Sequence, residues 1–307
     1  MEKQCYTIEK TMSAAEQGMI MRDYLKKEIR VSRRALSAIK YKGGKLLVDG
    51  QERSVRYVLQ EGEVLTIIFP AETPSDFLSD EAMPLDIVYE DEVVLIVNKP
   101  SGIPVIPSHQ YPSGTLANGL LRYFKEQNLA STVHIINRLD RNTSGLMLVA
   151  KHRFSHERFF KMQKKKEVHR RYLACVEGRI EQGSGIIDAP IGRRDGSAIE
   201  RQVDWQNGRR SITHYKVLRR SKDWTLVAVR LQTGRTHQIR VHFASIGHPL
   251  LGDDLYGGKM NLIDRQALHS FEVSFTHPFT GASIHLHKQC PDDMLRLISE
   301  PINLETI

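Results

Sequence analysis

An aspartate between two arginines is the first candidate for chemistry in this sequence. Asp140 lies between Arg138 and Arg141, in a polar segment that ends at Gly145 and separates two apolar stretches. Loops at strand ends are places where a rigid scaffold presents side chains to a substrate, and nearby cations favour an ionised carboxyl group. Asp140 is therefore a candidate nucleophile or base. The alternative reading of the local sequence is a structural turn, in which Asp140 caps backbone N–H groups.

Other segments accompany Asp140 in a recognisable order. Tyr172 lies in a segment that reads as a strand, and Arg240 in a segment that reads as a helix. Either could also have a purely structural role, as a core tyrosine or a solvated arginine. In order and spacing, these segments resemble the RluA-type pseudouridine synthases, from about residue 85 to residue 290. The matching segments are Tyr89–Gly102, Arg138–Gly145, Arg171–Gly178, Leu231–His242 and His248–Gly258.

The resemblance implies a role for each matching residue. Asp140 is expected to be the essential carboxylate, and Tyr172 to stack near the target uracil and to serve in proton transfer or positioning. Arg240 is expected to pair with Asp140, which opposes the drift of a buried carboxyl group toward neutrality. Arg138 is expected to fill the space that the flipped base leaves. The other residues of this part expected to bind RNA are Arg141, Thr143, Arg235 and His237.

The implied reaction breaks the bond between C1′ and N1 of uridine, rotates the base and rejoins it through C5. Substrate and product are isomers, so no redox cofactor, metal or nucleotide cofactor is expected. The carboxylate could attack C1′ or C6, or remove a proton from the 2′ carbon, and the sequence leaves this open. A stacked uridine must be flipped to be reached. The expected partner is structured RNA, with ribosomal RNA preferred and transfer RNA as the alternative.

Two positions depart from the family pattern. Asn137 stands where relatives often have a histidine before Arg-Leu-Asp, and Ile106 stands where many have the histidine of a His-Pro pair. Asparagine forms hydrogen bonds but does not titrate, so no proton transfer is expected at this position. Neither departure concerns Asp140, Tyr172 or Arg240.

The N-terminal segment predicts a small unit of two helices, a hairpin and a strand. Ser32 is a plausible cap for a helix from Arg33 to about Tyr41, and Asp49-Gly50 is a tight-turn signal. The order of elements resembles the S4 RNA-binding domain, which implies that the cations of the second helix contact RNA. A solvated helix face is the alternative. The cations expected to bind RNA are Arg33, Arg34 and Lys40.

The whole chain is expected to have an α+β fold. Short strands without regular βαβ alternation predict a catalytic domain with a largely antiparallel mixed sheet flanked by helices, preceded by the small S4-like α/β domain. Isoleucine and phenylalanine at helical spacing predict a helix from Thr236 to Ile246, with Ile239, Phe243 and Ile246 on its buried face. The expected boundaries are an S4-like domain over 1–70, a linker over 71–84 and a catalytic domain over 85–307.

Composition agrees with these expectations. Lys and Arg number 44 against 36 Asp and Glu, which gives a formal charge of +8 and suits a polyanionic partner. The 3 cysteines are far apart and suit a reducing compartment. We find neither a signal-peptide core nor a run of about 18 apolar residues. A cytoplasmic protein without a membrane partner is expected, and a monomer is the default.

Two other functions are open at this point. The first is a non-catalytic RNA-binding or ribosome-assembly factor that keeps the fold, although the joint presence of Asp140, Tyr172 and Arg240 argues against it. The second is a metalloenzyme built on some of the 13 histidines. His237 and His242 are five positions apart on an expected helix, so their side chains diverge, and no carboxylate-rich metal motif accompanies them. No metal site is expected.

Overall fold

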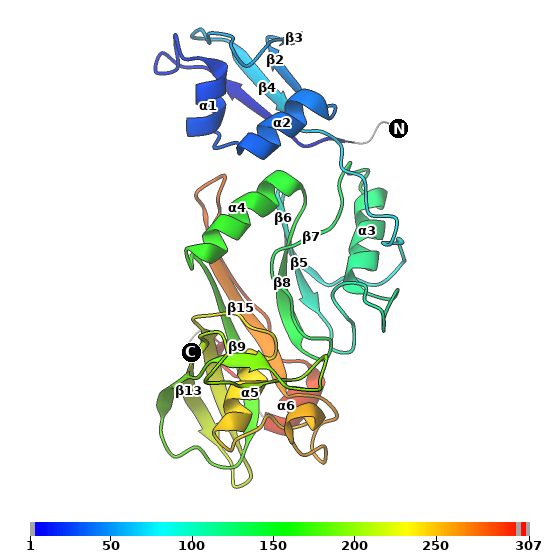
Figure 1. Cartoon of the computed structure of the whole chain (residues 1–307), viewed down its shortest axis with the longest axis vertical. Helices are drawn as coiled ribbons and strands as arrows, with labels where there is room; N and C mark the ends of the chain where they lie inside the picture. Colours follow the sequence, from blue (N-terminus) through cyan, green and yellow to red (C-terminus); the bar gives the residue numbers. More distant parts are fainter. Residues whose placement is uncertain (1–3, 299–301, 305–307) are drawn as a thin grey trace.

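Two units lie along the long axis of the molecule. The computed structural model describes residues 4–298 and 302–304. Figure 1 shows a small N-terminal unit beside a larger unit built on one twisted sheet. The N-terminal unit has its own apolar core, and the larger unit has extensive cores on both faces of its sheet. Each unit is therefore built from helices and strands that surround its own core.

The N-terminal unit packs two helices against a four-stranded antiparallel sheet of order β1-β4-β2-β3. Ser32 caps the second helix as expected, because its hydroxyl accepts a hydrogen bond from Ala35 N at 3.1 Å. The first strand was not expected: only one of its five residues is even partly buried, so it lacks an apolar alternation. The elements are β1 (Thr7–Thr11), α1 (Met21–Lys27), α2 (Arg33–Tyr41), β2 (Lys45–Val48), β3 (Gln51–Glu52) and β4 (Val64–Ile68).

The larger unit is built on a sheet of order β10-β13-β14-β9-β15-β8-β6-β5, with β16 paired to β15 and β7 to β8. Among the described pairs, β8–β15 is parallel and the others are antiparallel. This confirms the expected α+β class with a largely antiparallel mixed sheet. The strands are β5 (Ile87–Glu90), β6 (Val94–Lys99), β7 (His134–Ile135), β8 (Ser144–Ala150), β9 (Val168–Glu177), β10 (Ser184–Asp188), β13 (Ile212–Arg220), β14 (Trp224–Leu231), β15 (Leu268–Thr276) and β16 (Ser283–His287).

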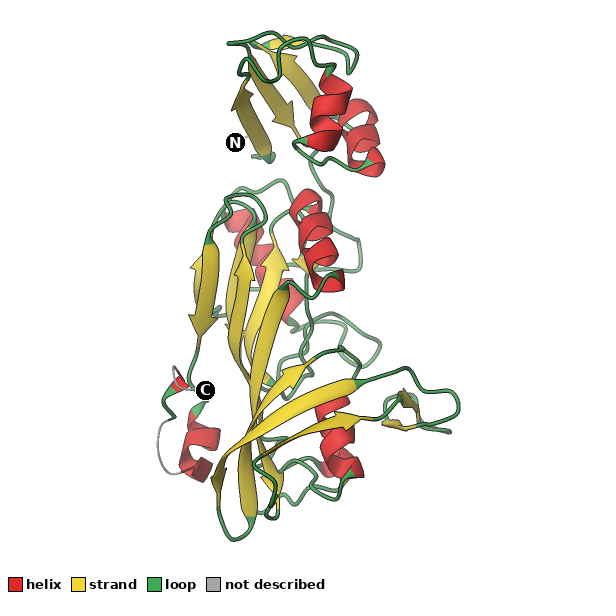
Figure 2. Ribbon diagram, turned by 90° about the vertical axis from the view of Figure 1, so that its left-hand side faces the viewer, coloured by secondary structure: helices red, strands yellow, loops and turns green. Residues whose placement is uncertain are grey.

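Helices cover the sheet, and one hairpin projects from it. Figure 1 shows α3 (Leu116–Glu126) and α4 (Arg153–Lys164) on opposite sides of β5, β6 and β8. Figure 2 shows a two-stranded hairpin, formed by β11 (Ile191–Arg193) and β12 (Arg201–Val203), that extends away from the sheet. The remaining helices of the described chain are α5 (Gln238–Ser245), a short 3-10 helix (Asp254–Tyr256) and α6 (Asp292–Ile298).

Helix α5 differs from its prediction at both ends. We expected it to span Thr236 to Ile246 with three buried apolar residues. Ile239 and Phe243 are 4% and 0% exposed, but Ile246 is 41% exposed, so the prediction for Ile246 was wrong. The helix ends before Ile246, which therefore leaves the buried face. At the other end, His237 has a φ of 57°, outside the right-handed helical region, so the helix begins at Gln238, two residues later than predicted.

An aromatic cluster joins the two units. The ring of Tyr6 stacks on that of His152 with centroids 3.6 Å apart, and Phe69 stacks on Phe154 at 4.7 Å. The first residue of each pair belongs to the N-terminal part and the second to the larger unit. Such ring pairs contribute beyond the area that they bury. The contact therefore holds the N-terminal unit beside the start of α4.

The segment predicted as a linker over 71–84 makes several contacts with the larger unit. The Glu72 carboxylate accepts a hydrogen bond from Arg153 N at 2.7 Å. Further along, Asn118 Nδ2 donates to the Ser79 carbonyl oxygen, also at 2.7 Å. The segment therefore lies along the larger unit and follows α3.

Gly145 at the start of β8 generates a prediction about stability. Its φ is +114°, and a Cβ placed there would lie 2.3 Å from the Ser270 carbonyl oxygen on β15. We expect Gly145→Ala to lower the free energy of unfolding by at least about 2 kcal/mol, because it adds both a strained φ and a backbone clash. Thermal unfolding followed by circular dichroism measures the change.

The matched control is Gly183→Ala, since nothing lies within 4 Å of a Cβ at that open position. Equal melting temperatures for the two variants would show that the β8–β15 contact has no need of a glycine.

Candidate active site

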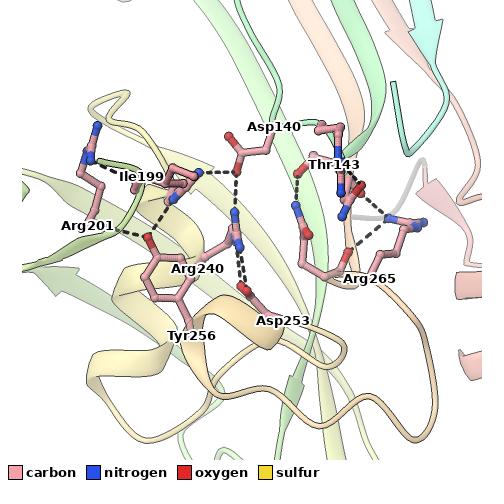
Figure 3. Close-up of polar contacts among 12 residues, drawn as sticks. Asp140, Thr143, Ile199, Arg201, Arg240, Asp253, Tyr256 and Arg265 are labelled. Atoms are coloured by element: carbon pink, nitrogen blue, oxygen red, sulfur yellow. Dashed lines mark hydrogen bonds and ion pairs between the residues drawn. The ribbon is translucent and has the colours of Figure 1, made fainter. Parts of the chain in front are cut away.

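Asp140 lies in the loop between β7 and β8. The Thr143 N–H donates to the Asp140 carbonyl oxygen at 3.1 Å, so the backbone does form the turn that local sequence suggested. The carboxylate is nevertheless directed elsewhere: its Oδ2 atom meets Arg240, and the side chain keeps 27% of its surface exposed. Figure 3 shows this carboxylate facing Arg240. The turn and the presented carboxylate are therefore compatible features of one loop.

Two buried cations hold the Asp140 loop from behind. Lys99, at the end of β6, donates through Nζ to the Arg141 carbonyl oxygen at 2.9 Å. Arg265 donates through one guanidinium nitrogen to the Asn142 carbonyl oxygen at 3.0 Å, and its Nε pairs with Asp293 at 2.6 Å. Each cation thus supplies a hydrogen-bond donor to a backbone carbonyl of the loop. The loop backbone is thereby fixed at the two residues that follow Asp140.

The Lys99 amine is fully buried, with 0% of its surface exposed. It also donates to the carbonyl oxygens of Pro100 at 2.7 Å and Ile103 at 3.0 Å. Burial lowers the pKa of Lys99 to about 7, and the nearby Asp140 carboxylate opposes that shift. Three carbonyl acceptors give the ammonium form a partner for each of its N–H bonds.

Arg240 on α5 links Asp140 to a second, fully buried aspartate. Its Nε and one terminal nitrogen bind the two carboxylate oxygens of Asp253, each at 2.7 Å. Its remaining terminal nitrogen reaches Asp140 Oδ2 at 3.3 Å. Asp253 is 0% exposed and the Arg240 side chain 7%. The bidentate pair uses one edge of the planar guanidinium and leaves the other directed at Asp140.

His237 and Tyr256 extend this network to the projecting hairpin. His237 Nε2 lies 3.9 Å from Asp140 Oδ2, and its Nδ1 lies 2.8 Å from the Tyr256 hydroxyl. That hydroxyl accepts a hydrogen bond from the Arg201 backbone N–H at 3.0 Å. The Tyr256 ring also lies 4.9 Å from the Arg240 guanidinium carbon. Burial lowers the pKa of His237, although Asp140 opposes the shift, so a neutral ring is favoured.

Tyr172 lies near this network but within the core. It is 5% exposed in the middle part of β9. The same apolar cluster contains Leu139 and Ile239, the chain neighbours of Asp140 and Arg240. A tyrosine in this position helps to fix the two segments that carry the charged residues.

The other residues predicted to bind RNA fall into three places. Thr143 is 2% exposed and its hydroxyl accepts a hydrogen bond from Gln266, so it faces the interior. Three of the predicted arginines are exposed around Asp140 or the start of α5. They are Arg138, Arg141 and Arg235. The exposed residues Arg33, Arg34 and Lys40 lie on α2 in the N-terminal unit and not beside Asp140.

Sequence reasoning assigned no role to four residues that build this site. Lys99, Asp253 and Tyr256 lie within segments that carried the family resemblance, but nothing in their local sequence shows which partner they meet. The fourth, Arg265, lies outside those segments. A charged residue in an otherwise apolar or glycine-rich stretch was the available signal, as with Lys99 after the apolar run of β6 and Asp253 after Gly252.

The two histidines considered as metal ligands have protein partners instead. His237 meets Tyr256, and His242 meets the Thr213 hydroxyl at 2.8 Å and the Ala189 carbonyl oxygen at 2.9 Å. Within residues 4–298 and 302–304, no group of three or more His, Cys, Asp or Glu side chains is arranged to hold a metal ion. The same residues include no helix with the length and apolar character needed to cross a membrane.

Known proteins are similar to this chain in sequence and in fold. The sequence profile described as RNA pseudouridylate synthase matches residues 93–245. The uncharacterized RNA pseudouridine synthase YjbO of Bacillus subtilis is 49% identical over 271 residues, which cover 88% of this chain and 95% of that protein. Ribosomal large subunit pseudouridine synthase D of Xanthomonas campestris is 37% identical over 274 residues, 84% of this chain and 81% of its own.

A solved structure agrees with these matches. Human RNA pseudouridylate synthase domain containing 1 superimposes with a TM-score of 0.59 and 26% sequence identity, covering 73% of this chain and 92% of the human one. The matched profile includes Asp140, Tyr172 and Arg240. The sequence identity, the coverage and the shared fold together show that this chain belongs to the RluA-type family of RNA pseudouridine synthases, which are isomerases that act on RNA.

Proposed function

We propose that this enzyme isomerises specific uridines of structured ribosomal RNA and that Asp140 is the group that acts on them. The observation that carries the assignment is the Asp140 carboxylate, partly exposed at 27% and directed at a buried Arg240–Asp253 pair. It is an ionisable group at the surface, supported by a network that is closed to water. Nucleophiles and bases in enzymes commonly have this arrangement.

The contacts of Asp140 leave one of its carboxylate oxygens available to a substrate. Arg240 and His237 both meet its Oδ2 atom, which leaves Oδ1 for the substrate. Arg240 makes two hydrogen bonds to Asp253 and a single contact to Asp140 at 3.3 Å, so it orients the Asp140 carboxylate without enclosing it. Both attack on a ring or sugar carbon and removal of the 2′ proton need the ionised form.

Basic side chains around the carboxylate support an RNA substrate. Arg138 and Arg141 lie close to Asp140 in the chain, Arg235 lies just before α5, and all three are exposed. The projecting hairpin is continuous with it through the Arg201–Tyr256 hydrogen bond. Beyond that hairpin, the Trp205 ring is 74% exposed and is available to stack on a base. Cations for phosphates next to an exposed aromatic are typical of surfaces that hold unstacked RNA.

The choice of ribosomal RNA draws on relatives and on the N-terminal unit. Several similar proteins bear the name ribosomal large subunit pseudouridine synthase D. We take the N-terminal unit to be S4-like and to bind RNA through α2, which adds contact area on a large target. Transfer RNA is the alternative substrate. We propose that the enzyme acts as a monomer and that it works in the cytoplasm.

The first prediction concerns Asp140 itself. Asp140→Asn keeps the shape of the side chain but removes its charge, so we expect pseudouridine formation to fall by at least roughly 10³-fold. Pseudouridine mapping of total RNA, from cells lacking the gene and then expressing either form, measures the effect. The wild type is expected to restore specific modified positions and Asp140→Asn to restore none. Full restoration by the variant would sink the catalytic assignment.

The second prediction concerns the basic helix of the N-terminal unit. Arg33→Glu combined with Arg34→Glu is expected to weaken binding of total ribosomal RNA and to reduce the slope of log affinity against log salt by about 1 to 2, since up to two phosphate contacts are lost. Filter binding at several salt concentrations measures both quantities.

Its matched control is Lys26→Glu with Lys27→Glu on α1, which changes the net charge equally within the same unit. If both double variants lose the same amount of RNA affinity, the effect of the α2 substitutions comes from the change in net charge and not from α2 itself. Unchanged affinity at every salt concentration would remove α2 from the RNA-binding surface.

A further inference from the structure

The outer face of α4 carries an exposed aromatic ring between basic side chains. Phe160 is 50% exposed, in the middle of a helix that otherwise buries its apolar residues. Its ring stacks with that of His156, with centroids 6.4 Å apart and planes 24° from parallel. Lys164 Nζ lies 4.7 Å from the Phe160 centroid. The helix therefore presents a flat apolar surface to solvent with a cation beside it.

The stack continues inward from His156. The His156 ring packs against that of His134 at 5.5 Å, and His134 in turn meets the Glu72 carboxylate. Burial lowers the pKa of His156, so its ring is neutral at physiological pH and suited to stacking. Three rings thus form a row from the junction of the two units to the outer face of α4.

Cations border this row of rings. Glu157 and Glu167 are the acids within the same stretch, and Glu167 already pairs with Lys165 at 3.8 Å. The exposed cations of α4 and of the turn after it are Arg153, Lys161, Lys164, Lys165 and Lys166. This surplus of positive charge is suited to an anionic partner.

The surface also continues toward the basic helix of the N-terminal unit. A groove of about 1050 Å³ lies between the two units. It is lined by Ala38 of α2 and Lys42 just after that helix, and by His134 and Arg153 of the larger unit. Arg34 lies four residues before Ala38, and therefore on the same stripe of α2. Glu9 and Glu92 also line the groove, together with the cations Lys42, Lys151 and Arg153.

A charged helix face can be merely solvated, and α4 could have been such a face. Solvation alone, however, gives no reason for a half-exposed phenyl ring placed between a neutral imidazole and a lysine. Surfaces that bind single-stranded nucleic acid combine these two features: aromatic rings that stack on bases and cations that follow the phosphates. A helix of a protein partner would bury the ring but would leave the lysines without an anionic counterpart.

We propose that the outer face of α4, formed by His156, Phe160, Lys161 and Lys164, binds a single-stranded segment of the RNA substrate. A base stacks on Phe160, and the two lysines contact the adjoining phosphates. The inference rests on the proposed function, since it assigns a second contact to the same RNA. The two contacts are separated by the length of β8, roughly 20 Å at about 3.3 Å per residue. A large folded RNA can reach both.

Removal of the ring gives the most direct test. In the modification of total RNA from cells lacking the gene, we expect Phe160→Ala to raise KM by about 5- to 150-fold, the loss of one stacked base, with kcat unchanged. Phe160→Trp keeps a stacking surface and is expected to retain the wild-type KM. Phe77→Ala is the control, because Phe77 is also exposed, at 89%, but lies in the 71–84 segment and not on α4.

The lysines are tested separately through salt dependence. Lys161→Glu with Lys164→Glu is expected to weaken binding of the same RNA and to reduce its salt slope by about 1.4, which corresponds to two contacts with single-stranded phosphates. Lys216→Glu with Lys222→Glu, two exposed lysines of β13 and the turn after it, changes the net charge equally and serves as the control.

Cross-linking identifies the occupant. With p-benzoylphenylalanine at position 160, irradiation in cell extract is expected to join the protein to unpaired nucleotides of RNA, which sequencing then locates. An unchanged KM for Phe160→Ala, an equal rise for Phe77→Ala, or cross-links to protein alone would each overturn the inference. If Asp140→Asn retains full turnover, the proposed function fails. If Phe160→Ala leaves KM unchanged while Asp140→Asn abolishes turnover, only the α4 contact is refuted.

Discussion

The buried pair between Arg240 and Asp253 is the constraint on which the rest of this site depends. A fully buried carboxylate is costly unless a cation and hydrogen bonds satisfy it, and Arg240 does both with two bonds of 2.7 Å. Removal of one partner from such a pair leaves an unpaired buried charge, at a cost of roughly 3–5 kcal/mol. The pair therefore fixes α5 against the turn that carries Asp253. The orientation of the guanidinium toward Asp140 follows from that fixed position.

The same logic extends to the loop that carries Asp140. Lys99 and Arg265 approach its backbone from β6 and from the segment before β15, and each binds a carbonyl oxygen of the loop. The carboxylate is thus held by buried charges on one side and exposed to solvent on the other. Preorganised charges of this kind need little rearrangement as the reaction proceeds. The surfaces that we propose to meet RNA are, by contrast, exposed: they are the arginines near Asp140 in the chain, the projecting hairpin and the basic faces of α2 and α4.

Particular residues show how far the sequence predicted this structure. The α+β class and the pairing of Arg240 with Asp140 were predicted, because apolar periodicity and the family resemblance specify them, and both agree with the structure. Strand β1 was missed because an edge strand with exposed side chains has no apolar alternation. Lys99 and Arg265 were missed because the loop carbonyls that they bind lie 42 and 123 residues away. Asp253 was missed because its local sequence does not show that it meets Arg240, 13 residues earlier. Ile246 was placed wrongly because a helical period does not reveal where the helix ends.

A double-mutant cycle between Asp253 and Arg240 tests the central claim most directly. The measurement is the single-turnover rate constant for pseudouridine formation at saturating RNA, for Asp253→Asn, Arg240→Leu and the double variant, with folding checked by thermal unfolding. If Asp253 acts through Arg240, Asp253→Asn slows the reaction and has little further effect once Arg240 is Leu, so the double variant matches Arg240→Leu. Strictly additive effects, or a wild-type rate for Asp253→Asn, would contradict the account.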